Sequence, residues 1–246
     1  MSVFISGKLF FAAAMALAFC LLQVEIPAQE NYKNFSLSLN YNYTTTARIF
    51  LNPNSPEEIL RNNAFYMEDI YSPSADLRYR LTEDLLIGLN VEYIRKVQTG
   101  PNLTVLGTEG TQTIDVEDGF KVIPFELSVY YLLPFSTEKF KFMMGGGLAY
   151  YYGEQLRKFG NEEVSNLSRD FAYGIQAMVS SDYMITRFLS LRGEMKFRDP
   201  EFEVTSKYKY KRVNYYGSTI VLAQDTFQSK INIDGVTFTL GMAFHF

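Results

Sequence analysis

The chain has 246 residues, a formal net charge of −4 and a single cysteine. Its charge is modestly acidic and spread along the chain, which excludes the basic stripe typical of nucleic-acid-binding proteins. Aromatic residues are abundant, with 18 Tyr and 21 Phe but no Trp. After the N-terminal region, no apolar run is long enough for a transmembrane helix.

The N-terminal region has the layout of a secretory signal peptide. Lys8 is the only charged residue before Glu25, and the run from Leu9 to Leu22 is apolar throughout. This run is too short to span a bilayer comfortably. We therefore expect cleavage near Ala28.

Cleavage there divides the chain into a signal peptide, residues 1–28, and one mature domain, residues 29–246. The single cysteine, Cys20, lies in the signal and follows the bulky Phe19. A lipoprotein signal has a small residue at that place, so we interpret Cys20 as part of the signal core. The mature chain then has no cysteine, which suits an exported protein that does not depend on disulfides.

Segments of alternating apolar and polar residues predict antiparallel strands along the mature chain. The first runs from Phe35 to Tyr43, with Ser and Asn between its apolar residues. A long polar segment, residues 45–72, follows, and within it we expect a short helix at residues 56–63. The second strand, residues 75–81, and the third, residues 85–93, are joined by a tight turn.

Residues 96–119 are interpreted as a second long loop. The fourth strand, residues 125–133, and the fifth, residues 140–150, form a hairpin with a short turn. A third long connection covers residues 152–169. The sixth strand, residues 171–179, comes next and ends at a short turn near residues 181–187.

The seventh strand covers residues 189–197, and the longest connection, residues 198–230, precedes the eighth. The eighth strand, Val236 to Phe246, has a large apolar residue at every even position and small or polar residues at the odd ones. A strand of this length spans roughly 37 Å, and at a tilt near 45° it rises about 26 Å, close to the apolar band of a transmembrane barrel.

Eight strands joined alternately by short turns and long connections predict an all-β fold, an eight-stranded antiparallel up-and-down transmembrane β-barrel with long extracellular loops and short periplasmic turns. The longest connection also alternates, from Lys207 to Lys211, and we interpret it as a protruding hairpin or strand extensions. A ten-stranded barrel is the alternative. A soluble, lipocalin-like barrel is a further alternative. The interior of eight strands is too narrow for so many Phe, Tyr and Leu side chains, so we expect these to face lipid.

Apolar faces in contact with lipid predict aromatic belts at both membrane interfaces. At the loop end the expected residues are Tyr43, Tyr93, Tyr150, Tyr173 and Phe197. At the turn end they are Phe35, Tyr79, Tyr131, Phe140, Phe244 and Phe246.

Two segments resemble a known superfamily. The run from Val122 to Leu132 (VIPFELSVYYL), a short turn and the run from Phe142 to Tyr150 (FMMGGGLAY) look like the central hairpin of small outer-membrane barrels of the OmpW and OmpA-like superfamily. The terminal Phe246 is similar to the C-terminal aromatic of those proteins. The resemblance implies that Phe246 is a signal read by the barrel-assembly machinery, and that the protein lies in a Gram-negative outer membrane, among its lipids and lipopolysaccharide.

Charged residues of both signs fall on the faces expected to point into the barrel. Unpaired charges in so narrow a space are costly, so they should form a hydrogen-bonded ion-pair network. The network is interpreted either as a structural plug or as a gated path of low conductance. Its expected members are Asp76, Arg78, Arg80, Glu92, Glu126, Lys141, Arg192, Glu194 and Lys196.

The sequence points to no catalytic residue, cofactor or metal site. Its only histidine, His245, lies beside the terminus at the periplasmic end, where we expect a hydrogen-bonded filler. We therefore predict a monomeric, non-enzymatic, porin-like barrel that is structural or admits small solutes. The alternative is surface adhesion or ligand binding through the loops, for which residues 207–212 offer a basic and aromatic stretch.

Overall fold

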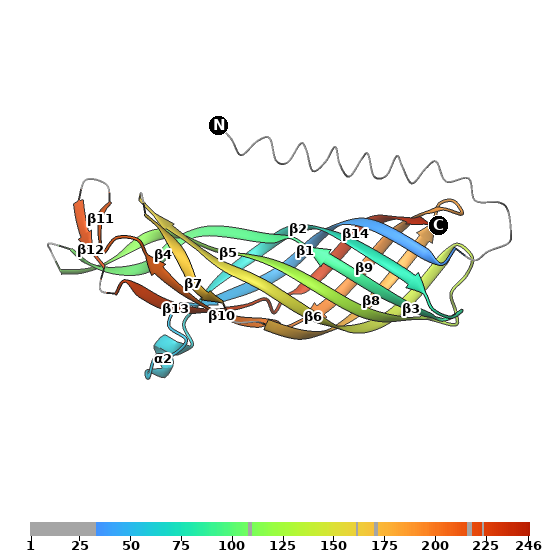
Figure 1. Cartoon of the computed structure of the whole chain (residues 1–246), viewed down its shortest axis with the longest axis horizontal. Helices are drawn as coiled ribbons and strands as arrows, with labels where there is room; N and C mark the ends of the chain where they lie inside the picture. The colour runs from blue at the N-terminus through green and yellow to red at the C-terminus, as the bar shows by residue number, and fades with distance from the viewer. Residues whose placement is uncertain (1–32, 108–109, 161, 170–171, 216–217, 223) are drawn as a thin grey trace, which may run out of the picture. The chain divides into compact units, whose positions relative to one another are not determined.

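The computed structural model describes residues 33–107, 110–160, 162–169, 172–215, 218–222 and 224–246, and nearly all of them lie in antiparallel strands (Figure 1). The predicted signal peptide, residues 1–28, and Phe171 of the predicted sixth strand lie outside these residues. The only α-helix in the described part is α2 (Glu58–Arg61), which agrees with the short helix expected at residues 56–63. No described helix is long and apolar enough to cross a membrane.

A ring of eight strands forms the barrel, which confirms the predicted fold class. The ring closes because the first strand pairs on one side with the second and on the other with the last, where Tyr41 lies opposite Leu240. Around the ring the strands are β1 (Phe35–Phe50), β2 (Ala64–Arg80), β3 (Leu85–Glu92), β5 (Gly110–Leu132), β6 (Phe140–Phe159), β8 (Ala172–Met184), β9 (Leu189–Arg198) and β14 (Val236–His245).

The wall continues beyond this ring as a second stretch of sheet, here called the extension. The ends of β1, β5 and β6 run into it and pair there with strands that belong to the extension alone, and the end of β2 runs into it paired with β1. Those strands are β4 (Ile94–Gly107), β7 (Glu162–Arg169), β10 (Glu201–Tyr208), β11 (Arg212–Tyr215), β12 (Ser218–Val221) and β13 (Thr226–Asn232).

The extension shows that the prediction of long loops was wrong for residues 45–72, 96–119 and 152–169, whereas the hairpin and strand extensions expected in residues 198–230 are present as β10, β11, β12 and β13. Much of each range is strand, because pairing satisfies backbone groups that a loop would leave to water. The hairpin of β11 and β12 comes from the longest of these ranges and reaches β4, where Val221 lies opposite Leu106.

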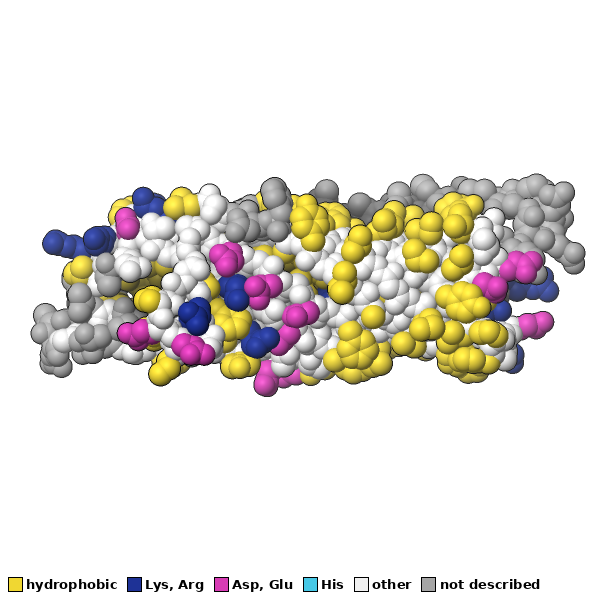
Figure 2. All heavy atoms as spheres, turned by 90° about the horizontal axis from the view of Figure 1, so that it is seen from below, with side chains coloured by type: hydrophobic (Ala, Val, Ile, Leu, Met, Phe, Trp, Pro, Cys, Tyr) yellow, Lys and Arg dark blue, Asp and Glu magenta, His cyan; other side chains and the backbone are white. Residues whose placement is uncertain are grey.

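The two parts of the wall differ in the residues that they mainly bury, although the ring also encloses a small apolar cluster of Leu86, Tyr130, Met143 and Met178. In the ring the outward side chains are apolar and exposed: Leu148 is 65% exposed and Ile175 77%, whereas Ser38 and Ser190, which point inward, are fully buried. This orientation excludes the lipocalin-like alternative. On the face drawn in Figure 2, hydrophobic side chains spread over the ring, and charged ones gather over the extension and at the turn end.

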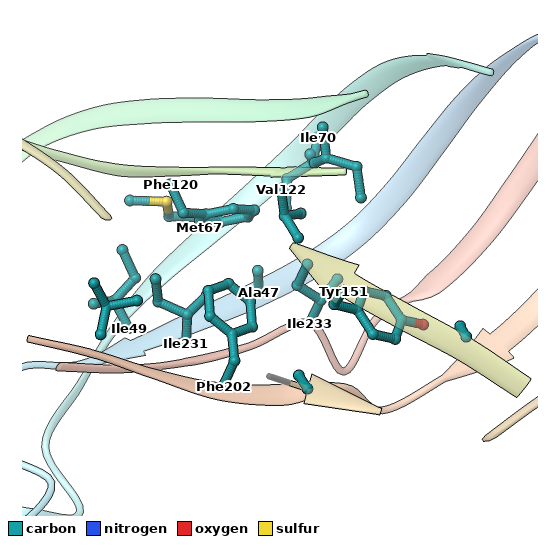
Figure 3. Packing of buried hydrophobic residues seen from close by; sticks show 14 residues of the cluster. Ala47, Ile49, Met67, Ile70, Phe120, Val122, Tyr151, Phe202, Ile231 and Ile233 are labelled. Carbon is teal, nitrogen blue, oxygen red and sulfur yellow. The ribbon is translucent and has the colours of Figure 1, made fainter. Parts of the chain in front are cut away.

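In the extension the apolar residues point inward and form two cores. The inner core lies nearest the ring, and Phe120, Val122, Met67 and Phe202 pack together there (Figure 3). The outer core lies toward the tip and closes on the hairpin of β11 and β12 through Val213 and Ile220. The interior of the extension is therefore filled by side chains.

Both expected aromatic belts are exposed on the outer face of the barrel. At the turn end the ring of Phe35 lies 4.7 Å from that of Tyr79 and stacks on that of Phe246 at 5.9 Å. At the other end Tyr150 and Tyr173 are in contact, with ring centroids 5.5 Å apart. Amphipathic rings at these two levels fit the two interfaces of a bilayer.

Candidate functional site in the barrel lumen

The lumen of the ring holds a buried cluster of charged side chains. They reach it because successive side chains of a strand point to opposite faces, so every second residue faces inward. The cluster draws on five strands, and all of its members have side chains no more than 6% exposed. They are Asp76 and Arg78 on β2, Glu92 on β3, Glu126 on β5, Asp182 on β8, and Arg192, Glu194, Lys196 and Arg198 on β9.

Nearest the turns, Arg192 forms the first layer of the cluster. Its guanidinium donates two hydrogen bonds to the carboxylate of Asp182, of 2.8 and 2.7 Å, and a third, of 2.8 Å, to Asp76. The hydroxyls of Ser36 and Ser38 accept further bonds from it. These acceptors lie on β8, β2 and β1. Arg192 on β9 therefore links its own strand to the neighbouring β8 and, past β14 on the other side, to β1 and β2.

Arg78 forms the middle layer. It donates to Asp76 at 2.8 Å and to Glu194 at 2.6 Å, and Ser180 accepts a bond from it at 3.1 Å. The guanidinium carbon lies 3.9 Å from the ring centre of Tyr130, whose hydroxyl donates to Glu194. The cation is thus held by carboxylates at its edge and by an aromatic ring on its face.

Lys196 and Arg198 form the layer nearest the extension. Lys196 donates to Glu126, and Arg198 donates to Glu92 at 2.7 Å and to Glu126 at 3.1 Å. The hydroxyl of Ser72 completes the contacts of Glu92. Because β3 and β9 stand on opposite sides of the ring, the bond between Arg198 and Glu92 crosses the whole lumen.

The structure brings together all of the predicted network residues except Arg80 and Lys141. Arg80 lies at the turn end and donates to the backbone oxygen of Glu83. Lys141 stands opposite Asp182 in the register of β6 and β8, but among the described residues no ion pair joins it to the network. Both lie where the lumen opens at the turns, so water can solvate them.

Sequence reasoning missed Asp182 and Arg198. The turn was expected to begin at Ser181 and the long connection at Arg198, whereas β8 continues to Met184 and β9 includes Arg198. Charge balance could have found Asp182, since the predicted inward set had one more cation than anions. Arg198 follows instead from continuing the alternation of β9 by one inward position beyond Lys196. Continuing the alternation of β8 by one inward position supplies Asp182.

His245 lies at the turn end, as expected from its position in the sequence. Its Nε2 atom lies 2.8 Å from the hydroxyl oxygen of Ser190, which is fully buried. The backbone oxygen of His245 accepts a bond from Lys33. Within the described part of the chain, no three His, Cys, Asp or Glu side chains are grouped so as to hold a metal ion.

Beyond the inner core, the extension contains one more buried ion pair. Arg157 donates to both carboxylate oxygens of Asp118, at 2.6 and 3.0 Å, and to the hydroxyl of Tyr208 at 3.0 Å. Burial raises the pKa of the Tyr208 phenol, against the opposing effect of Arg157. From the turns outward, the interior therefore alternates between a charged layer, an apolar core, this ion pair and a second apolar core.

No protein-family model matches the sequence, and no curated protein matches it. Solved structures of bacterial outer-membrane barrels do match the fold. OprG from Pseudomonas aeruginosa is 11% identical with a TM-score of 0.60, over 87% of this chain and 96% of OprG. Neisserial surface protein A is 12% identical with a TM-score of 0.45, over 86% of this chain and 97% of that protein. Outer membrane protein W of E. coli is 13% identical with a TM-score of 0.39, over 89% and 100%.

At these identities the likeness establishes the fold alone. The chain has the fold of a small bacterial outer-membrane β-barrel, as the hairpin and the terminal aromatic led us to expect. The closed ring and its apolar outer band place it in that membrane, since only a closed barrel leaves no unpaired strand edge in lipid.

Proposed function

We propose that this protein is a non-enzymatic barrel of the bacterial outer membrane that holds its lumen closed and admits small solutes only at low conductance. The observation that carries this proposal is the pairing of Arg198 with Glu92 and Glu126, which joins opposite walls of the ring. A straight path through the lumen would have to break these bonds.

Two further features support a closed lumen. The inner core lies directly beyond this layer, and its Ile70, Ile94 and Phe120 side chains are fully buried. A hydrated ion leaving the charged layer would therefore enter an apolar space, where solvation of its charge is lost. Conduction of an ion then requires the ion pairs of the lumen to exchange partners and the side chains of the inner core to move apart.

A solute-flux assay tests this proposal. Refolded protein is placed in liposomes, and swelling is followed with sugars of increasing size, with an open porin as the positive control. We expect swelling close to that of protein-free liposomes. Swelling as fast as that of the porin would contradict the proposal.

A second candidate function is surface recognition through the extension. Four exposed cations lie close together in the sequence: Lys207 on β10, Lys209 and Lys211 in the connection that follows, and Arg212 at the start of β11. A cluster of like charges on an exposed surface attracts anionic polymers and speeds their association. Replacing these four residues by Gln should abolish binding of a sulfated polysaccharide, and unchanged binding would exclude this stretch.

We also propose that Phe246 is the signal for the assembly machinery and that the barrel works as a monomer. Phe246 exchanges backbone hydrogen bonds of 2.9 and 3.0 Å with Phe35, so it completes the joint between the last and the first strand. Deletion of Phe246 should lower the amount of folded barrel in cells more than it lowers refolding in detergent. Equal losses in both would mean that the residue acts only in packing.

A further inference from the structure

Two cations stand side by side on the outer surface, just beyond the aromatic belt at the loop end. Arg95 on β4 lies directly opposite Lys121 on β5 in the register of the two strands. Both side chains point outward, because Ile94, Phe120 and Val122, their chain neighbours, are fully buried in the inner core. Like charges directly opposite each other on one face of a sheet repel.

One carboxylate lies near this pair. Glu154 on β6 stands opposite Lys121, and its oxygen lies 3.7 Å from the Lys121 nitrogen. Arg95 is exposed, and among the described residues it forms no ion pair. The ammonium group of Lys96, the next residue, donates a hydrogen bond to the backbone oxygen of Asp69. Among the described residues, Lys121 therefore has one carboxylate within ion-pair distance and Arg95 has none.

Outward cations on the other side of the wall are neutralised. Arg48 on β1 pairs with Asp234 at 2.7 Å, and Lys230 on β13 pairs with Glu201 at 3.2 Å. Glu203 also stands opposite Lys230 in the register of β10 and β13. Arg95 differs from these cations, because among the described residues it lies beside another cation and forms no ion pair.

The belt fixes the depth of the pair in the membrane. Tyr93 is two residues from Arg95 along the chain, on the same outward face, and Tyr152 is two residues from Glu154; the two tyrosines are 43% and 41% exposed. Aromatic belts lie at the level of the lipid headgroups. A two-residue step along a tilted strand then places Arg95 and Lys121 at the outer part of the headgroup layer.

We infer that Arg95 and Lys121 form a binding site for a phosphorylated headgroup of the outer-leaflet lipid, that is, for lipopolysaccharide. A phosphate between the two cations removes their repulsion and accepts charge-assisted hydrogen bonds from the guanidinium and the ammonium group. The inference rests on the location of the barrel in the outer membrane and not on the closure of its lumen.

The test measures the binding of lipopolysaccharide to the refolded protein in a neutral detergent, followed by the rise in the midpoint of its heat-dependent gel mobility shift. A ligand that binds only the folded barrel raises this midpoint. We expect each cation removed to lower the affinity for lipopolysaccharide at least about fivefold. The Arg95→Gln, Lys121→Gln double variant removes both. The Arg95→Lys, Lys121→Arg variant, which keeps both charges, should bind as the wild type does.

The matched control is Lys139→Gln with Arg187→Gln, which removes two exposed cations from the turns and should leave binding unchanged. Dephosphorylated lipopolysaccharide and inorganic phosphate should each fail to raise the midpoint. Equal binding by the double variant and the wild type would overturn the inference, as would equal binding of the dephosphorylated lipid. Loss of binding in the control variant alone would place the site at the turn end instead.

Discussion

Removing the Arg198 guanidinium should destabilise the barrel strongly. Arg198→Met keeps most of the stem of the side chain but leaves Glu92 with Ser72 as its remaining partner, while Glu126 keeps Lys196 and Asn90. The side chains of Arg198, Glu92 and Glu126 are at most 1% exposed. Breaking a buried ion pair on one side costs about 3–5 kcal/mol, because the remaining charge is left without compensation.

An exposed pair provides the control. Lys158 lies 3.4 Å from Glu163 in the extension, with the two side chains 50% and 72% exposed. Lys158→Met should cost no more than about 1 kcal/mol, since water screens such a pair. Both variants remove one cation and introduce the same residue, so the difference between them reports burial.

Urea unfolding of the refolded protein in lipid vesicles measures both costs. The chain has no Trp, so circular dichroism and the gel mobility shift are better probes than Trp fluorescence. Adding Glu92→Gln to Arg198→Met should recover part of the loss, because it removes the uncompensated charge. A loss for Arg198→Met no larger than that for Lys158→Met would refute the role given to the network.

Two more predictions concern packing and pH. Gly147→Ala should prevent folding, because a Cβ atom there would lie 2.2 Å from the backbone oxygen of Leu127. Gly146→Ala is the control and should fold, because the nearest contact of its Cβ atom would be at 3.4 Å. The gel mobility shift distinguishes folded from unfolded protein in both variants. The pKa of the Tyr208 phenol is higher in the folded protein than in the unfolded chain, where it is near 10. The phenol therefore stabilises the fold fully below pH 10, and this stabilisation is lost as the pH rises through the pKa of the folded state. Tyr208→Phe should remove that part of the loss at high pH. The difference in phenolate absorbance between the wild type and Tyr208→Phe should appear only above pH 10, and a difference that titrates near pH 10 would contradict this.

Much of the ring could be predicted from the sequence, because lipid and a narrow lumen demand opposite residue types at alternate positions. In β14 this demand is strict, and the alternation from Val236 to Phe246 is unbroken. The same reasoning placed Asp76, Arg78, Glu126 and Arg192 in the lumen, where the structure has them. Pairing between particular charges was not predictable, because it depends on which walls face each other across the ring.

The extension could not be predicted in the same way. Beyond the membrane the apolar side chains turn inward. In β5 the inward positions stay even-numbered but become mainly apolar from Val122 outward, whereas in β1 the buried positions change from even to odd between Thr44 and Ala47. An irregularity marks this change: Asp69 has a positive φ of 54° where the pairing of β1 and β2 is interrupted. A second irregularity lies within the extension, where the register of β4 and β5 shifts between Gly100 and Leu103. A pattern that slips by one residue at such points resembles a loop.

Single-channel recording of the refolded protein in a planar bilayer tests the closed lumen most directly. We expect the wild type to leave the bilayer silent or to show only small, brief steps. Lys196→Met with Arg198→Met, together with Glu92→Gln and Glu126→Gln, removes the charged layer nearest the extension without leaving a buried charge from those pairs, and should conduct more often. Large, steady conductance in the wild type, unchanged in the fourfold variant, would contradict the account.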